Sequence, residues 1–138
     1  MTTHPTPAQI RDTMPFATLV GIELLEAVPR LVRGRLDWAP ERCTAGGLMH
    51  GGALMTLADT CGGVCAFLNL PEGALATATI ESKTNFMRAV REGAVTATTR
   101  PLHLGRTLVV LETELADDRE TLLAKVTQTQ AFHYPRGS

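Results

Sequence analysis

Residues 50–70 read HGGALMTLADTCGGVCAFLNL, and this stretch decides how the rest of the chain can fold. Its only charged residue is Asp59; every other position from Gly51 to Phe67 is apolar, small or hydroxylated. Apolar residues recur in the three- and four-residue steps of an α-helix, at Leu54, Leu57, Cys61, Val64 and Leu68. The pattern predicts a helix that is buried on all its faces.

Asp59 has two interpretations. In the first it is a buried carboxylate held by a nearby hydroxyl, that of Thr56 or Thr60. Buried acids are rare unless they are paired or functional, which favours the second interpretation. There Asp59 is a base or nucleophile, and the free N–H groups of Gly51 and Gly52 at the positive end of the helix form an oxyanion site.

The spacing of these groups predicts a dimer. Gly51 and Asp59 are eight residues apart, which is roughly 12 Å along a helix axis. Both groups would have to lie within about 3 Å of the reacting carbonyl group. One helix can hardly supply both, whereas two antiparallel copies could, each offering its N-terminus to the Asp59 of the other.

Length and composition favour one compact domain. With 138 residues, of which 44% are apolar, residues 1–138 can bury one sizeable core, with residues 1–7 and 134–138 as loose ends. A net charge of −1 gives no field that would attract nucleic acid or an anionic membrane. No apolar run approaches the roughly 20 residues that span a bilayer, and no signal peptide opens the chain, so we expect a cytoplasmic protein.

The three cysteines, Cys43, Cys61 and Cys65, are expected to be reduced core residues. No second Cys/His pair stands at metal-ligand spacing, so neither a metal nor another cofactor is expected.

The remaining chain is mostly strand-like. A short helix is expected from Thr6 or Pro7 to Met14, and a mostly apolar stretch follows over 16–28, extended over 22–27. Residues 31–38 alternate as a half-buried strand and form a hairpin with that segment. Further strands are expected over 76–87, 94–104, 107–115 and 122–133, joined by short turns as a four-strand meander. The expected class is α+β, with one antiparallel sheet wrapped around the long helix.

Three motifs give the chain a resemblance to a known family. They are GGLMHGGAL at 46–54 leading into LADT at 57–60, ESKTNFMR at 81–88, and LGRTL at 104–108. From about Phe16 to His133 the sequence resembles the hotdog-fold thioesterases, in the branch typified by the phenylacetate-pathway acyl-CoA thioesterase. HGG with an acid eight residues after its first glycine is the specific part.

The resemblance implies a hotdog fold that hydrolyses an acyl-CoA or aryl-CoA thioester. It implies homodimers with shared active sites, paired into a homotetramer. Asp59 would attack the thioester or activate water, and the Gly51 N–H of the facing subunit would hold the thioester oxygen. Thr79 matches a hydroxyl residue near that carboxylate, although a threonine in a strand is ordinary. Thr44 stands where relatives often have Asn or Gln, which puts rate and substrate range in question.

His50 also falls in the expected site. It could transfer a proton, but we favour a ring that forms a hydrogen bond with a neighbouring carbonyl and so orients Gly51.

The coenzyme would meet a second group of residues. Arg88 and Arg106 match positions that contact the CoA nucleotide, although each alone could be a solvated strand edge. Gly52 belongs to the substrate-binding helix start, and the pantetheine path would be lined by Phe86, Met87, His103 and Gly105.

The leading hypothesis is therefore an acyl-CoA thioesterase for an aryl or medium-chain acyl group. A hotdog dehydratase or hydratase is the nearest competing enzyme, but those pair a histidine with an acid at a different spacing. A non-catalytic acyl-CoA-binding dimer is the alternative of another class, and Thr44 is the residue that allows it.

Overall fold

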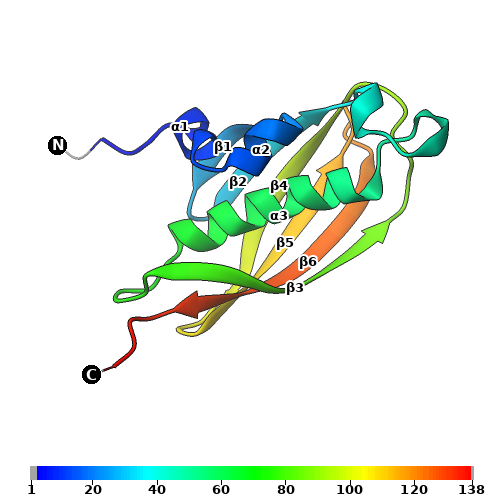
Figure 1. The fold of residues 1–138 in the computed structure, drawn as a ribbon. Coiled ribbons are helices and arrows are strands. Elements are labelled where there is room, and N and C mark those ends of the chain that lie inside the picture. Colours follow the sequence, from blue (N-terminus) through cyan, green and yellow to red (C-terminus); the bar gives the residue numbers. More distant parts are fainter. Residues whose placement is uncertain (1–2, 138) are drawn as a thin grey trace.

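A computed structural model describes residues 3–137, which form one six-stranded antiparallel sheet with a long helix along one face (Figure 1). The predicted α+β class, with a sheet around a central helix, is confirmed. The helices are α1 (Pro7–Asp12), α2 (Pro15–Val20) and α3 (Gly51–Leu68), with short 3-10 turns η1 (Pro40–Arg42) and η2 (Ala45–Gly47). The strands are β1 (Glu23–Val28), β2 (Leu31–Asp37), β3 (Ala76–Phe86), β4 (Ala94–Leu104), β5 (Leu108–Ala116) and β6 (Leu122–His133).

The strand order is β1-β2-β4-β5-β6-β3, so the predicted four-strand meander is wrong at its first connection. β4 pairs with β2, and β3 crosses to the far edge of the sheet and pairs with β6. The physical reason lies in the side chains. β4 alternates buried residues, as a central strand should, whereas β3 is mostly exposed and suits an edge. The free edge of β3 carries the exposed side chain of Ile80 at a bulge.

The core lies between α3 and the sheet. Leu57 and Cys61 of α3 are fully buried against strand residues such as Leu36, Val95 and Leu111. The helix approaches β2 closely at Gly34, where a Cβ atom would lie 2.6 Å from Cys61 Sγ. A side chain at position 34 would therefore push the helix off the sheet.

α3 is not buried on all faces within one chain. Met55, Asp59 and Phe67 are exposed, and their spacing in steps of four or eight places them on one stripe. The stripe lies between the edge strand β3 on one side and α1 and α2 on the other, and the described residues leave it exposed. The prediction that the helix is buried on all its faces is therefore wrong for a single chain, and so is the less favoured interpretation of Asp59 as a buried carboxylate.

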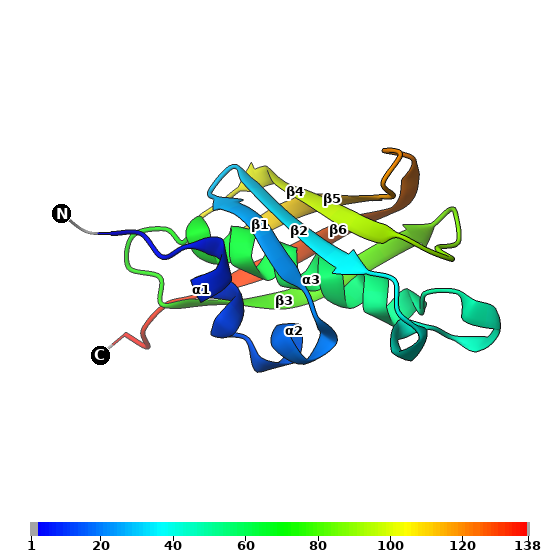
Figure 2. The ribbon, with the colours of Figure 1, turned by 90° about the horizontal axis from the view of Figure 1, so that it is seen from above.

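The N-terminal segment forms two short helices beside β1 (Figure 2). α1 begins at Pro7, as predicted, but ends at Asp12 rather than at Met14. Thr6 is its N-cap and accepts the Gln9 N–H at 3.2 Å. The apolar stretch after Met14 is helical over Pro15–Val20 before it becomes β1, because Pro15 at the first helical position has a backbone already suited to a helix.

By length and composition, α3 is the one helix within residues 3–137 that could cross a bilayer. This is weak evidence for a membrane protein, because α3 packs its apolar side chains into the core.

Candidate active site

Asp59 lies midway along α3, on the exposed stripe. Its Oδ1 accepts a hydrogen bond of 2.9 Å from Thr79 Oγ1 of the edge strand β3. Thr56 does not hold it, because the Thr56 hydroxyl donates to the Gly52 carbonyl at 2.8 Å. The sequence-predicted pair Asp59 and Thr79 is thus in direct contact.

Asp59 borders two hollows. The larger, about 640 Å³, lies between α1, α3 and β3, and it is lined mostly by apolar side chains such as Ile10, Val64 and Phe67. The second, about 510 Å³, lies beside Met14, Phe16 and Met55. A carboxylate at the wall of an apolar hollow is an arrangement that can act on the polar end of an otherwise apolar molecule.

The start of α3 presents one unused backbone donor. His50 is the N-cap residue, and its Nδ1 accepts the Gly52 N–H at 2.7 Å. The predicted partner of the ring, a carbonyl, is therefore wrong: the first turn of a helix offers N–H groups, and an unprotonated Nδ1 accepts one. Ala53 N donates to the His50 carbonyl. Gly51 N has no acceptor among residues 3–137.

Gly51 lines a separate hollow of about 350 Å³, together with Thr44, Phe86, Met87 and Arg88. The Phe86 ring lies against the glycine, since a Cβ atom there would stand 3.2 Å from Phe86 Cζ. These predicted site residues come from three separate segments, and the fold brings them together at the N-terminal end of α3.

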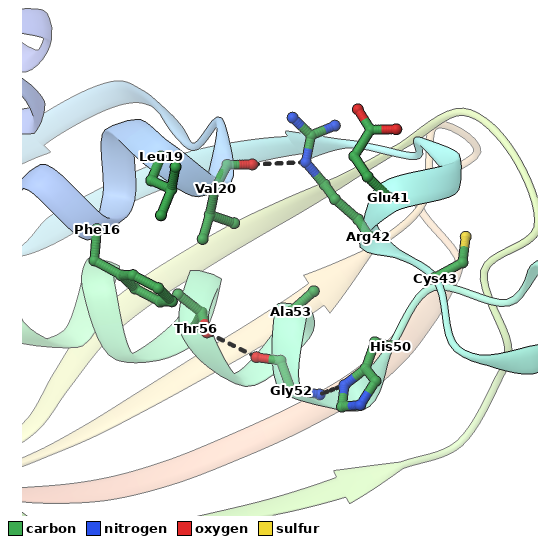
Figure 3. Close-up of a pocket in the computed structure, with 10 residues that line it drawn as sticks. All are labelled: Phe16, Leu19, Val20, Glu41, Arg42, Cys43, His50, Gly52, Ala53 and Thr56. Carbon is green, nitrogen blue, oxygen red and sulfur yellow. Dashed lines mark hydrogen bonds between the residues drawn. The ribbon is translucent and has the colours of Figure 1, made fainter.

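A further hollow of about 540 Å³ lies on the opposite side of the same helix end, between α2, η1 and α3 (Figure 3). His50, Gly52 and Thr56 face it from α3, and Phe16 and Leu19 face it from α2. Arg42 closes one side, because its Nε donates to the Val20 carbonyl at 2.6 Å.

One chain does not gather all the predicted residues. The β4–β5 turn with His103, Gly105 and Arg106 lies beside the start of β3 and the end of β6, at the C-terminal end of α3 (Figure 1). Arg88 lies at the other end of the sheet, where β3 finishes. Neither Arg88 nor Arg106 forms an ion pair within residues 3–137, so both cations are free to meet an anion.

The sequence alone did not identify two glutamines of β6 as site residues. Gln130 is 2% exposed and lines the larger hollow at Asp59, and Gln128 is fully buried behind it. The sequence shows two amides at alternate positions of the strand, 128 and 130, which predicts that both side chains lie on one face of the sheet. What was missing was the pairing of β6 with β3, which places Gln130 directly across from Thr79.

The cysteines take no part in this site. Cys61 is buried, and burial raises the pKa of its thiol to about 12; burial likewise raises the pKa of Cys65 to about 11. Both are free thiols of the core, as predicted, whereas Cys43 is only half-buried. Within residues 3–137, no group of three or more His, Cys, Asp or Glu side chains could hold a metal ion.

Known proteins resemble this chain in sequence and in fold. The family model described as the Thioesterase superfamily matches residues 46–124, more than half of the chain. The chain is 36% identical over 86 residues to 1,4-dihydroxy-2-naphthoyl-CoA hydrolase of Escherichia coli K12, covering 62% of each protein. Its fold matches a crystal structure of a mutant thioesterase PA1618 from Pseudomonas aeruginosa with a TM-score of 0.89, at 25% identity over 96% of this chain and 97% of that one.

A mutant of the phenylacetic acid degradation protein PaaI from Thermus thermophilus has the same fold. Its TM-score is 0.77 at 21% identity, over 86% of this chain and 98% of that one.

The fold and these relatives define the class, a thioester hydrolase with the hotdog architecture. The chain belongs to the thioesterase superfamily, and the family identified from its motifs is confirmed.

Proposed function

We propose that this protein hydrolyses an acyl-CoA or aryl-CoA thioester, with Asp59 as the catalytic carboxylate. The observation that carries the proposal is the position of Asp59: its Oδ1 is held by Thr79 at 2.9 Å, and it stands at the wall of the apolar hollow of about 640 Å³. That hollow has room for an aryl or medium-chain acyl group, and the carboxylate would meet the thioester at its mouth.

Two routes of hydrolysis are open to this carboxylate. It could attack the thioester carbon, so that the C–S bond breaks and water then cleaves the resulting anhydride. It could instead take a proton from water, whose oxygen then attacks the same carbon while the thiolate leaves. In both routes negative charge grows on the thioester oxygen, which needs an N–H donor aimed at it.

The Gly51 N–H of a facing subunit would supply that donor. Within one chain Gly51 and Asp59 line different hollows, as the helix rise requires. The exposed α3 stripe and the free edge of β3 lie on the surface that a second copy would cover. Two-fold pairing brings opposite ends of the two chains together, which would also unite Arg88 of one subunit with Arg106 of the other around a CoA nucleotide.

The family supports the acyl-CoA substrate. One relative is named as a hydrolase of 1,4-dihydroxy-2-naphthoyl-CoA, an aryl thioester. We propose an active homodimer, with two dimers pairing as a homotetramer in the cytoplasm, and no dependence on a metal or cofactor.

The test begins with Asp59→Asn against a panel of aryl-, short-, medium- and long-chain acyl-CoA thioesters. Turnover of the best substrate should fall at least about 100-fold, because the amide neither attacks nor accepts a proton. Unchanged turnover in this variant would refute the role of Asp59. An inactive parent that still binds acyl-CoA would favour the non-catalytic dimer.

Gly51 offers a matched pair of variants. It is the first residue of α3, where proline is tolerated, and His50 has an extended backbone (ψ 133°) that suits a following proline. Gly51→Pro therefore deletes the N–H, whereas Gly51→Ala keeps it and adds the same Cβ contact with Phe86. We expect kcat to fall by roughly 100-fold in the proline variant and to stay near wild type in the alanine variant.

Mixed dimers test whether the site is shared. A heterodimer of Asp59→Asn and Gly51→Pro subunits contains one site with both defects and one intact site. Subunits exchanged at equal amounts should therefore recover about one quarter of the wild-type activity from two inactive parents. No recovery, with heterodimers present by native mass spectrometry, would contradict the shared site.

A further inference from the structure

A chain of side-chain hydrogen bonds runs from the interior of the protein to Asp59. Gln130 Nε2 donates to Thr79 Oγ1 at 2.9 Å, and Thr79 Oγ1 donates to Asp59 Oδ1 at 2.9 Å. Inward from there, Gln130 Nε2 donates to Gln128 Oε1 at 2.6 Å. Gln130 and Gln128 are 2% and 0% exposed, so the inner half of the chain is shielded from water.

When Asp59 is ionised, only one assignment of donors and acceptors fits this chain of hydrogen bonds. A carboxylate only accepts hydrogen bonds, so the single hydroxyl proton of Thr79 points to Asp59. The second neighbour of Thr79 Oγ1 must then be a donor, which fixes the Nε2 of Gln130 on that side. Thr77 strengthens the arrangement, because its hydroxyl donates to Gln130 Oε1 at 2.9 Å.

The fixed donor and acceptor order leaves one buried polar atom without a partner at the inner end of the hydrogen-bond chain. Gln128 must present its oxygen to Gln130, and its own Nε2 is then buried without a hydrogen-bond partner among residues 3–137. A buried N–H without an acceptor is unfavourable. Rotating the Gln128 amide would set two NH₂ groups against each other, so the unpaired nitrogen follows from the way the chain is ordered toward Asp59.

We infer that Gln130 is a positioning residue for thioester hydrolysis, acting through Thr79; this inference rests on the proposed function of Asp59. By donating to Thr79, Gln130 keeps that hydroxyl turned toward Oδ1. The carboxylate is thereby held in one orientation, and Oδ2, which accepts no hydrogen bond within residues 3–137, is the oxygen left to act on water or the thioester. Without Gln130 the Thr79 hydroxyl can rotate, and the carboxylate loses its fixed direction.

The test compares Gln130→Met, Thr79→Val and the double variant on the best thioester substrate. Each single change should lower kcat by roughly 10-fold, the scale of a mispositioned catalytic group. In the double variant the loss should be no larger than in Thr79→Val alone, because Gln130 acts through Thr79. Thr79→Ser, which keeps the hydroxyl, should retain most of kcat.

Thr99→Val is the matched control, because it removes a buried hydrogen bond that lies away from Asp59. It breaks the buried hydroxyl pair of Thr99 and Thr113, at 2.7 Å between β4 and β5, and should lower thermal stability without changing kcat. If Gln130→Met does not fold, Thr77→Val replaces it, because it removes the donor that fixes Gln130. It should lower kcat several-fold, with no further loss in a Thr79→Val background.

Wild-type kcat in Gln130→Met, or a double variant that loses the product of the two single effects, would overturn the inference. Asp59→Asn separates this result from failure of the proposed function. If Asp59→Asn is inactive while Gln130→Met has the kcat of wild type, the role of Gln130 is refuted and the role of Asp59 stands.

Discussion

His50 Nδ1 accepts the N–H of Gly52 at 2.7 Å, so the ring of the residue before α3 caps the first turn of that helix. The cap occupies the Gly52 donor and leaves the Gly51 donor free. His50 is therefore expected to orient the helix start rather than to exchange protons.

Two substitutions separate these roles. Asparagine is a good N-cap and has no titrating ring, so His50→Asn should keep most of kcat, whereas His50→Ala should lose about 1 kcal/mol of stability and part of kcat. Thermal unfolding and steady-state kinetics measure both. Equal loss of kcat in the two variants, with the asparagine cap retained, would instead point to proton transfer.

Gly62 gives the buried amides their space, which leads to a second prediction. A Cβ atom at position 62 would overlap the Gln128 carboxamide. Gly62→Ala should therefore displace Gln128 and lower kcat, while the gain in helix propensity of about 1 kcal/mol offsets part of the lost stability. Gly63→Ala is the comparison variant, because a Cβ there meets Gln130 Nε2 only at 4.0 Å and should leave Gln128 in place. Gly63 also lines the hollow at Asp59, so kcat, and not KM, is the quantity compared. Equal kinetics for the two variants would contradict the prediction.

Arg88 and Arg106 should bind the nucleotide of CoA from two subunits. Replacing either with alanine should raise KM for a CoA thioester by roughly 5-fold, the size of an exposed charge pair worth about 1 kcal/mol. The N-acetylcysteamine thioester of the same acid lacks the nucleotide, and its KM should not change. Arg100→Ala is the control, since Arg100 is an exposed arginine outside the proposed site. An equal rise in KM for both thioesters would refute nucleotide contact.

Thiol reactivity follows from burial. Because burial raises the pKa of Cys61 to about 12 and that of Cys65 to about 11, almost no thiolate forms at either residue near pH 8. Iodoacetamide should modify the half-buried Cys43 alone in the folded protein and all three cysteines in urea. All three cysteines lie in one tryptic peptide, residues 43–83, so fragmentation of that peptide by tandem mass spectrometry reads out each site. Rapid native labelling of Cys61 would show that the helix opens.

Asp117 should make the free energy of unfolding decrease as the pH falls into the acid range. Its Oδ1 accepts the N–H groups of Thr121 and Arg119, each at 2.9 Å, and the Thr121 hydrogen bond leads the causes that lower the pKa of this carboxyl. The ionised group therefore stabilises the β5–β6 turn above its unfolded pKa of about 3.9. This contribution disappears as the pH falls through the lower folded pKa. Wild type should unfold at higher urea than Asp117→Ala at pH 7, and the gap should narrow in strong acid; a constant gap would contradict this.

The sequence predicted much of the fold because its signals were local. The helical period of residues 54–68, the cap at Thr6 and the turn at Pro29-Arg30 each depend on near neighbours. The order of the strands does not, and β3 was assigned to the wrong neighbour because a short connection was taken for a hairpin. The pairing of Asp59 with Thr79 was expected from family resemblance, whereas Gln130 could be found only once β6 was known to lie beside β3.

The prediction of a helix buried on all its faces failed for a related reason. Apolar and small residues surround Asp59 in sequence, but a single chain covers only the sheet side of the helix. A pattern of hydrophobicity along one helix does not show which of its faces the rest of the chain covers.

The unpaired edge of β3 has a consequence for the newly made protein. It exposes backbone donors and acceptors together with Leu75, Ile80 and Phe86, each at least half exposed, next to the strand position of Thr79. Such an edge can template aggregation until something pairs with it. In the proposed dimer, a subunit that has not yet paired would be both inactive and open to off-pathway association, so subunit pairing would complete the site and protect this edge together.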